Sequence, residues 1–187
     1  HGKTTTTSLI SAIFSKTKLD PTIINGGVLN SFNNSARLGK GDWCILESDE
    51  SDGSFIKVYP TYSIITNVDQ EHMDYYKNMD NLKKLFIKFI EKTPSFGKSF
   101  ICLDDKTNKE IIKKLKIKNF HTYGTDKNSQ FRIKNILQSK EFSQFDINIK
   151  LPGKKNYSIY DVKIPLLGLH NIRNATAAAA VAMTIGI

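Results

Sequence analysis

Short apolar runs, each bounded by turn residues, recur along most of this 187-residue chain, and they restrict its fold more than any other feature. They occupy residues 22–24, 43–46, 63–68, 100–103 and 120–123. Runs of this length are typical of parallel strands, because helices cover both faces of a parallel sheet. With 40% apolar residues, the chain can bury one substantial core.

Helical patterns lie between these runs. Apolar residues recur at helical spacing in residues 4–15 and 82–90, and residues 106–115 predict a helix with a lysine-rich face. Strands that alternate with helices predict an α/β fold, in which a mostly parallel sheet is flanked by helices.

The last third of the chain has a different pattern. Apolar and polar residues alternate within residues 130–164, where Pro152 and Gly153 mark a turn. We therefore expect a small antiparallel β insertion in this region. An alanine-rich helix is predicted to follow, over residues 175–182.

The net charge of +9 makes nucleic-acid binding a hypothesis to weigh, because clustered cations bind phosphate backbones. Only three of the 27 cationic residues are arginines, and the lysines are scattered through residues 83–118 and 127–163. We therefore expect a solvated basic surface and no nucleic-acid partner.

Two further features bear on the compartment. No run of 18 or more apolar residues occurs, so we expect no membrane insertion. Cys44 and Cys102 lie in apolar runs without a Cys or His at metal-ligand spacing, which predicts two buried free thiols in a reducing compartment. A cytoplasmic protein is the expectation.

The first four residues, His1-Gly2-Lys3-Thr4, match the end of a phosphate-binding loop of the form G-x-x-x-x-G-K-[ST]. There, backbone N–H groups at a helix N-terminus hold phosphates, the lysine reaches the β- and γ-phosphates, and the Ser/Thr hydroxyl ligates Mg²⁺. An ordinary glycine before a helix is the alternative. The threonine run that begins at Thr4 fits that alternative poorly, because β-branched residues are weak helix formers.

An acidic segment, residues 47–52, directly follows the apolar run at 43–46. Ligands of open α/β sheets bind beyond the carboxyl ends of the strands, so Glu47 and its neighbours are expected to face the phosphate loop. Four carboxylates within six residues repel one another unless a cation lies among them, and Mg²⁺ prefers oxygen ligands. A solvated acidic loop is the alternative.

Two further motifs complete the pattern. His72 follows the run at 63–68, and a neutral imidazole can complete a second metal site beside a carboxylate, although a polar surface role is the alternative. Asn171 and Asn174 are three residues apart at a predicted helix start, on one face of the helix. Their amides suit the edge of adenine, and a helix cap is the alternative.

In this order, the four motifs resemble the central domain of the Mur ligases over nearly the whole chain. Residues 25–27, 35–39 and 47–55 are most similar to the alanine-adding branch of that family. Murein-peptide recycling ligases usually carry Tyr at the place of Ser51, so they are the weaker alternative. Several sister ligases have a carbamylated lysine fifteen residues after the metal-binding histidine, where this chain has Ile87.

The resemblance implies roles for individual residues. Thr4 and Glu47 would bind one Mg²⁺, and Glu47 with His72 a second, so that Lys3, Glu47 and His72 would be the catalytic residues. The residues implied to bind ATP are Gly2, Lys3, Thr4, Thr5, His170, Asn171 and Asn174. The residues implied to border the muramoyl substrate are Arg37, Glu50 and Ser51.

The resemblance also implies the reaction and the context. The lactoyl carboxylate of UDP-N-acetylmuramate would attack the γ-phosphate of ATP, and L-alanine would displace phosphate from the acyl phosphate. Residues 1–187 would be the central ATP-binding domain of a bacterial cytoplasmic enzyme, inactive without its N-terminal UDP-binding domain, its C-terminal domain and a strand before the phosphate loop. The residues alone are also compatible with a different P-loop enzyme, an ATPase or a kinase.

Overall fold

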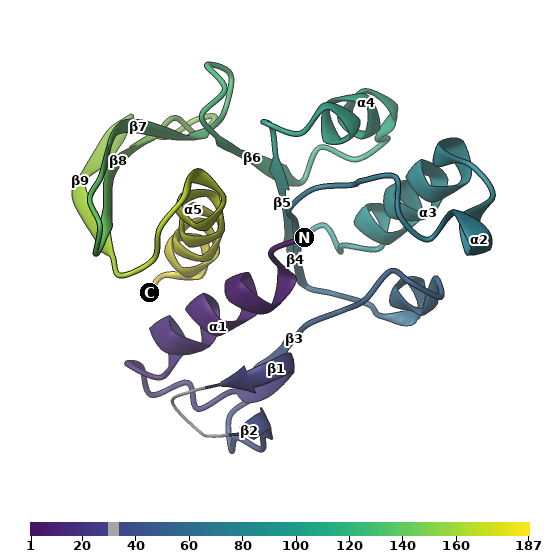
Figure 1. Ribbon diagram of the computed structural model, residues 1–187, viewed down its shortest axis with the longest axis horizontal. Helices are drawn as coiled ribbons and strands as arrows, with labels where there is room; N and C mark the ends of the chain where they lie inside the picture. Colours follow the sequence, from purple (N-terminus) through teal and green to yellow (C-terminus); the bar gives the residue numbers. More distant parts are fainter. Residues whose placement is uncertain (30–33) are drawn as a thin grey trace.

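A computed structural model describes residues 1–29 and 34–187 (Figure 1). It confirms the α/β fold with a mostly parallel sheet flanked by helices. The larger sheet has six strands in the order β4-β5-β6-β7-β8-β9, and the first four are mutually parallel. These strands are β4 (Tyr62–Ile65), β5 (Lys98–Cys102), β6 (Phe120–Gly124), β7 (Phe131–Gln138), β8 (Ser143–Ile149) and β9 (Tyr157–Ile164). The antiparallel β7, β8 and β9 confirm the predicted insertion.

A second, three-stranded sheet has the order β2-β1-β3. Its strands are β1 (Thr22–Leu29), β2 (Asn34–Arg37) and β3 (Cys44–Leu46). β1 and β3 are parallel and match predicted runs, whereas β2 is antiparallel to β1 and was not predicted. Its four residues are mostly polar and exposed, so no apolar run marks them.

The helices are α1 (Lys3–Phe14), α2 (Met73–Tyr76), α3 (Met79–Glu91), α4 (Lys106–Lys114) and α5 (Leu169–Ile185), with a 3₁₀ turn η1 (Ser54–Lys57). Side-chain caps begin two of them. Asn78 accepts a hydrogen bond from Asn81 N at the start of α3, and Asp105 accepts one from Asn108 N at the start of α4. None of the described helices is long and apolar enough to cross a membrane.

The helices form two layers on either side of the larger sheet. α3 and α4 cover one face of β4, β5 and β6, while α1 and α5 lie on the other side, with β7 to β9 curving around α5 (Figure 1). Ala177 and Ala180 of α5 are fully buried, and such small side chains let the helix lie close to both α1 and the sheet. Phe100, Phe131 and Phe145 fill the core opposite them. Burial of each such ring stabilises the fold by roughly 1.5–3 kcal/mol.

A cavity of about 730 Å³ separates the two sheets, lined by side chains of β3, β4 and α1. Within the described residues, β3 and β4 each have a neighbouring strand on one side only. Cys44 of β3 borders this cavity and is exposed, so the prediction of a buried thiol is wrong there. It holds for Cys102, where burial raises the pKa of the thiol to about 11.

Candidate functional site

The carboxyl ends of β3 and β4 meet the first turn of α1. After β4, Thr66 Oγ1 and Asn67 Nδ2 donate hydrogen bonds of 2.8 and 2.9 Å to the carbonyl oxygen of His1. After β3, the Glu47 carboxylate accepts hydrogen bonds from Thr4 Oγ1 at 2.9 Å and from the backbone N–H of Gly26 at 2.7 Å. The structure therefore brings the Gly-Lys-Thr motif and the acidic segment together.

Lys3 carries the positive charge of this region. Its Nζ donates to Glu50 Oε2 at 2.5 Å and to Asp49 Oδ1 at 3.1 Å. Partial burial opposes the charged form, but the hydrogen bonds that Lys3 donates to these two carboxylates, together with their negative charge, outweigh that effect and raise the pKa of Lys3. The ammonium group thus stays charged and points at the acidic segment.

The acidic segment is held in shape by hydroxyl groups. Ser51 Oγ donates to Asp49 Oδ2 at 2.7 Å, and together with Lys3 it lowers the pKa of Asp49 to about 2. Tyr76 of α2 donates its hydroxyl to the backbone carbonyl of Glu50. Burial and the nearby Glu50 charge raise the pKa of Tyr76 to about 12, so the phenol keeps its proton. The Asp49 carboxylate therefore remains ionised, and both acidic residues are held near Lys3.

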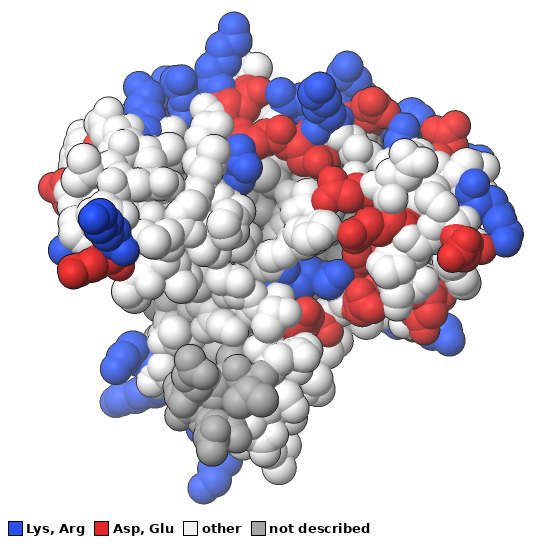
Figure 2. Space-filling model, in the orientation of Figure 1, with Lys and Arg blue, Asp and Glu red and all other residues white. Residues whose placement is uncertain are grey.

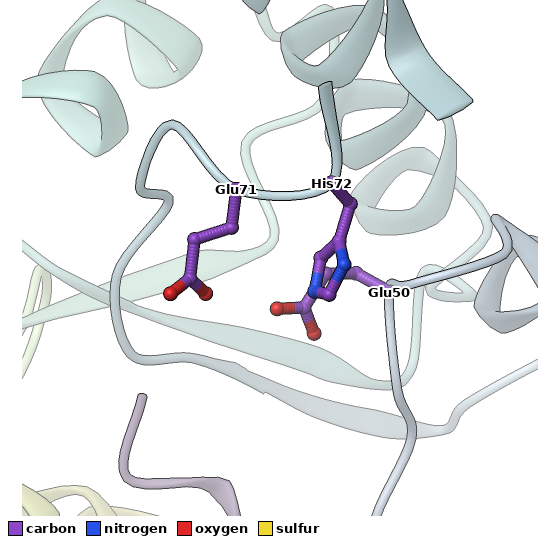
Figure 3. Close-up of side chains that lie close together, drawn as sticks. All are labelled: Glu50, Glu71 and His72. Carbon is purple, nitrogen blue, oxygen red and sulfur yellow. The ribbon is translucent and has the colours of Figure 1, made fainter. Parts of the chain in front are cut away.

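His72 lies with two carboxylates from two loops. Figure 3 shows Glu71 and His72 on one loop and Glu50 reaching them from the neighbouring loop. One ligand atom of each residue lies within 4.8 Å of the others, which is close enough to hold a metal ion. Glu47 is not a member of this group and lies with Thr4 instead. We call Lys3, Glu47, Glu50, Glu71 and His72 the acidic end of the site.

Charge is distributed unevenly over the face that carries this region. In Figure 2 the acidic side chains gather around a hollow in the middle of the view, whereas most lysines project from the rim. The scattered lysines are typical of a solvated surface rather than of a single basic stripe. A cation in the hollow would therefore be attracted by its surroundings.

The first turn of α5 forms the other end of the site. Asn171 Nδ2 donates to the carbonyl oxygen of Leu167 at 2.8 Å, and His170 is exposed beside it. Asn174 is 4% exposed and its Nδ2 has no hydrogen-bond partner among the described residues. A Cβ atom added to Gly2 would lie 2.8 Å from Asn174 Oδ1, so this amide lies directly against the phosphate loop. The two asparagines thus differ in exposure, although they share a helix face.

Two residues that were not predicted as site residues, Asp104 and Arg173, also meet here. Arg173 Nε donates to Asp104 Oδ2 at 2.6 Å, and the side chain of Asp104 is 7% exposed. Asp104 follows β5 directly, so the rule that ligands bind at the carboxyl ends of strands would have found it. We call Asp104, Asn171, Arg173 and Asn174 the amide end of the site.

Two predicted substrate residues have local partners instead. Arg37 lies on β2 and forms an ion pair with Asp20, away from the acidic end. Ser51 belongs to the acidic segment but its hydroxyl is bonded to Asp49. Glu50, the third residue of this group, lies inside the acidic end.

Residues 1–182 match the family described as Mur ligase middle domain. The chain belongs to this family. Solved structures with the same fold include the UDP-N-acetylmuramate:L-alanyl-gamma-D-glutamyl-meso-diaminopimelate ligase of Neisseria meningitides, with a TM-score of 0.83 and 24% identity over all of this chain and 60% of that one. The UDP-N-acetylmuramate-alanine ligase of Thermotoga maritima has a TM-score of 0.79 and 24% identity, over all of this chain and 40% of that one. The expected Mur ligase fold is confirmed.

Curated relatives of this Mur ligase domain are more similar in sequence. The chain is 72% identical over 187 residues to the UDP-N-acetylmuramate--L-alanine ligase of Pelagibacter ubique (strain HTCC1062). It is 42% identical over 188 residues to the ligase of the same name from Caulobacter sp. (strain K31). In both cases the alignment covers the whole chain and 40% of the relative, so the chain spans about two fifths of their length.

Proposed function

We propose that this domain binds ATP and Mg²⁺ in a cytoplasmic ligase that joins L-alanine to UDP-N-acetylmuramate. The observation that carries the proposal is the convergence of Lys3 and Thr4 at the start of α1 with Glu47 at the end of β3. The 72% identity to a curated ligase of that name supports the choice of substrates.

The residues present fit a hard divalent cation. Thr4 Oγ1 and the Glu47 carboxylate are 2.9 Å apart and both offer oxygen atoms. His72 and two carboxylates offer a second group of ligand atoms within 4.8 Å of one another. We therefore assign the first Mg²⁺ to Thr4 and Glu47, and a second to His72 and Glu50, whose ligand atoms lie within 4.8 Å of each other. Such ions neutralise the charge of the transferring phosphoryl group.

In the proposed reaction, the lactoyl carboxylate of UDP-N-acetylmuramate attacks the γ-phosphate of ATP, and ADP leaves. The amine of L-alanine then attacks the acyl phosphate, and phosphate and a proton are released. Lys3, now paired with Asp49 and Glu50, would move to the β- and γ-phosphates. The amides of Asn171 and Asn174, with His170 beside them, would bind the adenine, and Gly2 and Thr5 would border the phosphates. Positioning and charge neutralisation provide most of the catalysis in phosphoryl transfer.

The test uses the complete protein with ATP and Mg²⁺. ADP and phosphate should appear only when both UDP-N-acetylmuramate and L-alanine are present, and the sugar nucleotide should gain the mass of one alanine residue. ADP release that is independent of the sugar nucleotide would refute the ligase assignment. Turnover with the free peptide L-alanyl-gamma-D-glutamyl-meso-diaminopimelate as the amine, and none with L-alanine, would assign the domain to a recycling ligase.

A further inference from the structure

Three segments of the chain meet at the carboxylate of Asp104. It accepts hydrogen bonds from the backbone N–H groups of Thr125 and Asp126 at 3.0 and 2.9 Å, and from Thr125 Oγ1 at 3.0 Å. A Cβ atom on Gly124 would lie 2.6 Å from Asp104 Oδ1, so only glycine lets this turn close around the carboxylate. The end of β5 and the turn after β6 thereby form one rigid unit.

Arg173 joins the first turn of α5 to this unit. Its Nε donates to Asp104 Oδ2 at 2.6 Å, although the two residues are 69 positions apart in the sequence. Its side chain remains 32% exposed, and no hydrogen bond of its terminal nitrogens occurs among the described residues. The guanidinium group is thus fixed at one edge while its other donors face solvent.

The position of Arg173 connects it with the proposed nucleotide site. It stands three residues after His170 and therefore on the same side of α5. Its immediate neighbour Asn174 lies against Gly2 of the phosphate loop. A nucleotide whose phosphates lie at Gly2 and Lys3 would reach the start of α5 with its ribose and base.

The charge of Arg173 is balanced by an almost buried carboxylate. A guanidinium group that is neutralised in this way attracts phosphate weakly, but it keeps its hydrogen-bond donors and its flat face. Its remaining N–H groups can donate to uncharged acceptors, and its flat face can stack on an aromatic ring. Ribose hydroxyls, ring nitrogens and the plane of a purine base all have this chemistry.

We propose that Arg173 binds the ribose or base of ATP, and that Asp104 is the positioning residue that holds Arg173 for this contact. This inference rests on the proposed ATP site and extends it to two residues that are not among those predicted to bind ATP. Arg173 then distinguishes the nucleoside from the phosphates, which are bound at the opposite end by Lys3.

The experiment compares two probes on the complete protein, ATP and inorganic tripolyphosphate, by calorimetry in the presence of Mg²⁺. Arg173→Ala should weaken ATP binding about tenfold or more, because a hydrogen bond to a charged donor is lost, and should leave the affinity for tripolyphosphate unchanged. Asp104→Asn, which keeps the shape of the side chain, should weaken ATP binding in the same direction but less. Arg173→Gln serves as a second variant in case the alanine variant does not fold.

Lys109→Ala is the matched control. Lys109 forms a 2.7 Å ion pair with Asp126 of the same turn, but its side chain is 43% exposed, and the hydrogen bonds and ion pairs of the described residues do not join it to Asp104. The Lys109→Ala protein should bind ATP and tripolyphosphate with the same affinities as the parent protein.

Three results would overturn the inference. ATP affinity that is unchanged in folded Arg173→Ala and Arg173→Gln would exclude the contact. An equal loss of affinity for ATP and tripolyphosphate would assign Arg173 to the phosphates instead. Failure of the parent itself to bind ATP would refute the proposed function, and the parent titration makes this failure distinguishable from the other two.

Discussion

The two ends of the site are built in opposite ways. At the acidic end, several carboxylates surround one ammonium group, and Glu71 and His72 are exposed. At the amide end, Asp104 is nearly buried and accepts four hydrogen bonds, one of them from the cation Arg173. The residues of the acidic end have an excess of negative charge, whereas at the amide end the charges of Asp104 and Arg173 cancel.

This difference indicates how each end responds to a ligand. Clustered carboxylates favour the binding of cations, since each added positive charge relieves repulsion. A satisfied buried network is already organised and loses little freedom when a ligand arrives. We therefore expect chemistry and Mg²⁺ dependence to depend on the acidic end, and stability and nucleoside recognition on the amide end.

Lys3→Ala should have the largest effect on activity. It removes the group proposed to neutralise the β- and γ-phosphates, and turnover should fall by roughly a thousandfold. The measurement is ADP release by the complete protein, with thermal unfolding to check folding. Lys16→Ala, at an exposed lysine just after the other end of α1, is the control and should keep full turnover. Turnover of Lys3→Ala within a few-fold of the parent would contradict the phosphate assignment.

Glu47→Ala should come next, with a loss of roughly a hundredfold, because its carboxylate is proposed to bind the first Mg²⁺ together with Thr4. His72→Ala should lose less activity and should need more Mg²⁺ for half-maximal turnover. Mg²⁺ titrations of turnover and of melting temperature measure both effects. Glu141→Ala, at an exposed residue between β7 and β8, is the control. An unchanged Mg²⁺ requirement in His72→Ala would argue against a cation at His72.

Asp104→Asn tests the amide end through stability and pH. Burial raises the pKa of Asp104, but hydrogen bonds from Thr125, Asp126 and Arg173 outweigh it and hold that pKa below the ordinary range. The carboxylate therefore stabilises the fold above its unfolded pKa of about 4, and this stabilisation is lost as the pH falls through the lower folded pKa.

At pH 7 the Asn variant should be less stable by about 1.5–3 kcal/mol, as expected for hydrogen bonds to a charged group. Urea unfolding at pH 7 and at successively lower pH below 4 measures the difference, which should shrink as the pH falls. If the difference in free energy of unfolding between the parent and the variant stays constant with pH, the charge of Asp104 is not the cause of that difference.

Lys109→Ala should have the smallest effect, because its ion pair with Asp126 is only partly buried and the lysine side chain is 43% exposed. The free energy of unfolding should change by no more than about 1 kcal/mol, and the change should shrink further in high salt. Urea unfolding in low and high salt checks this. A loss as large as that of Asp104→Asn would remove the distinction between the nearly buried Asp104–Arg173 pair and the more exposed Lys109–Asp126 pair.

The sequence predicts most of the elements because their signals are local. The apolar stripe of α3, containing Leu82, Phe86 and Phe89, is buried as its spacing indicates. The run expected at 63–68 ends as a strand at Ile65, because Thr66 and Asn67 turn their side chains toward the start of α1. The motifs at the strand ends likewise predict that Glu47 lies close to the phosphate loop, where its carboxylate accepts a hydrogen bond from Thr4.

Pairing between distant segments is what the sequence does not reveal. β2 carries no apolar pattern and is recognisable only through its ladder with β1. The contact between Arg173 and Asp104 depends on how α5 packs against the sheet, and no local spacing encodes it. The same holds for the grouping of Glu50 with His72, which joins two loops.

The cavity between β3 and β4 gives the molecule an optical reporter. Trp43, the one tryptophan of the chain, borders this cavity and stacks on Tyr62 with their ring centroids 5.8 Å apart. Lys3 and Glu47 border the same cavity. The intrinsic fluorescence of Trp43, and its quenching by small solutes, should therefore change when a peptide segment or ligand enters between the sheets. No added fluorescent label is needed for this measurement.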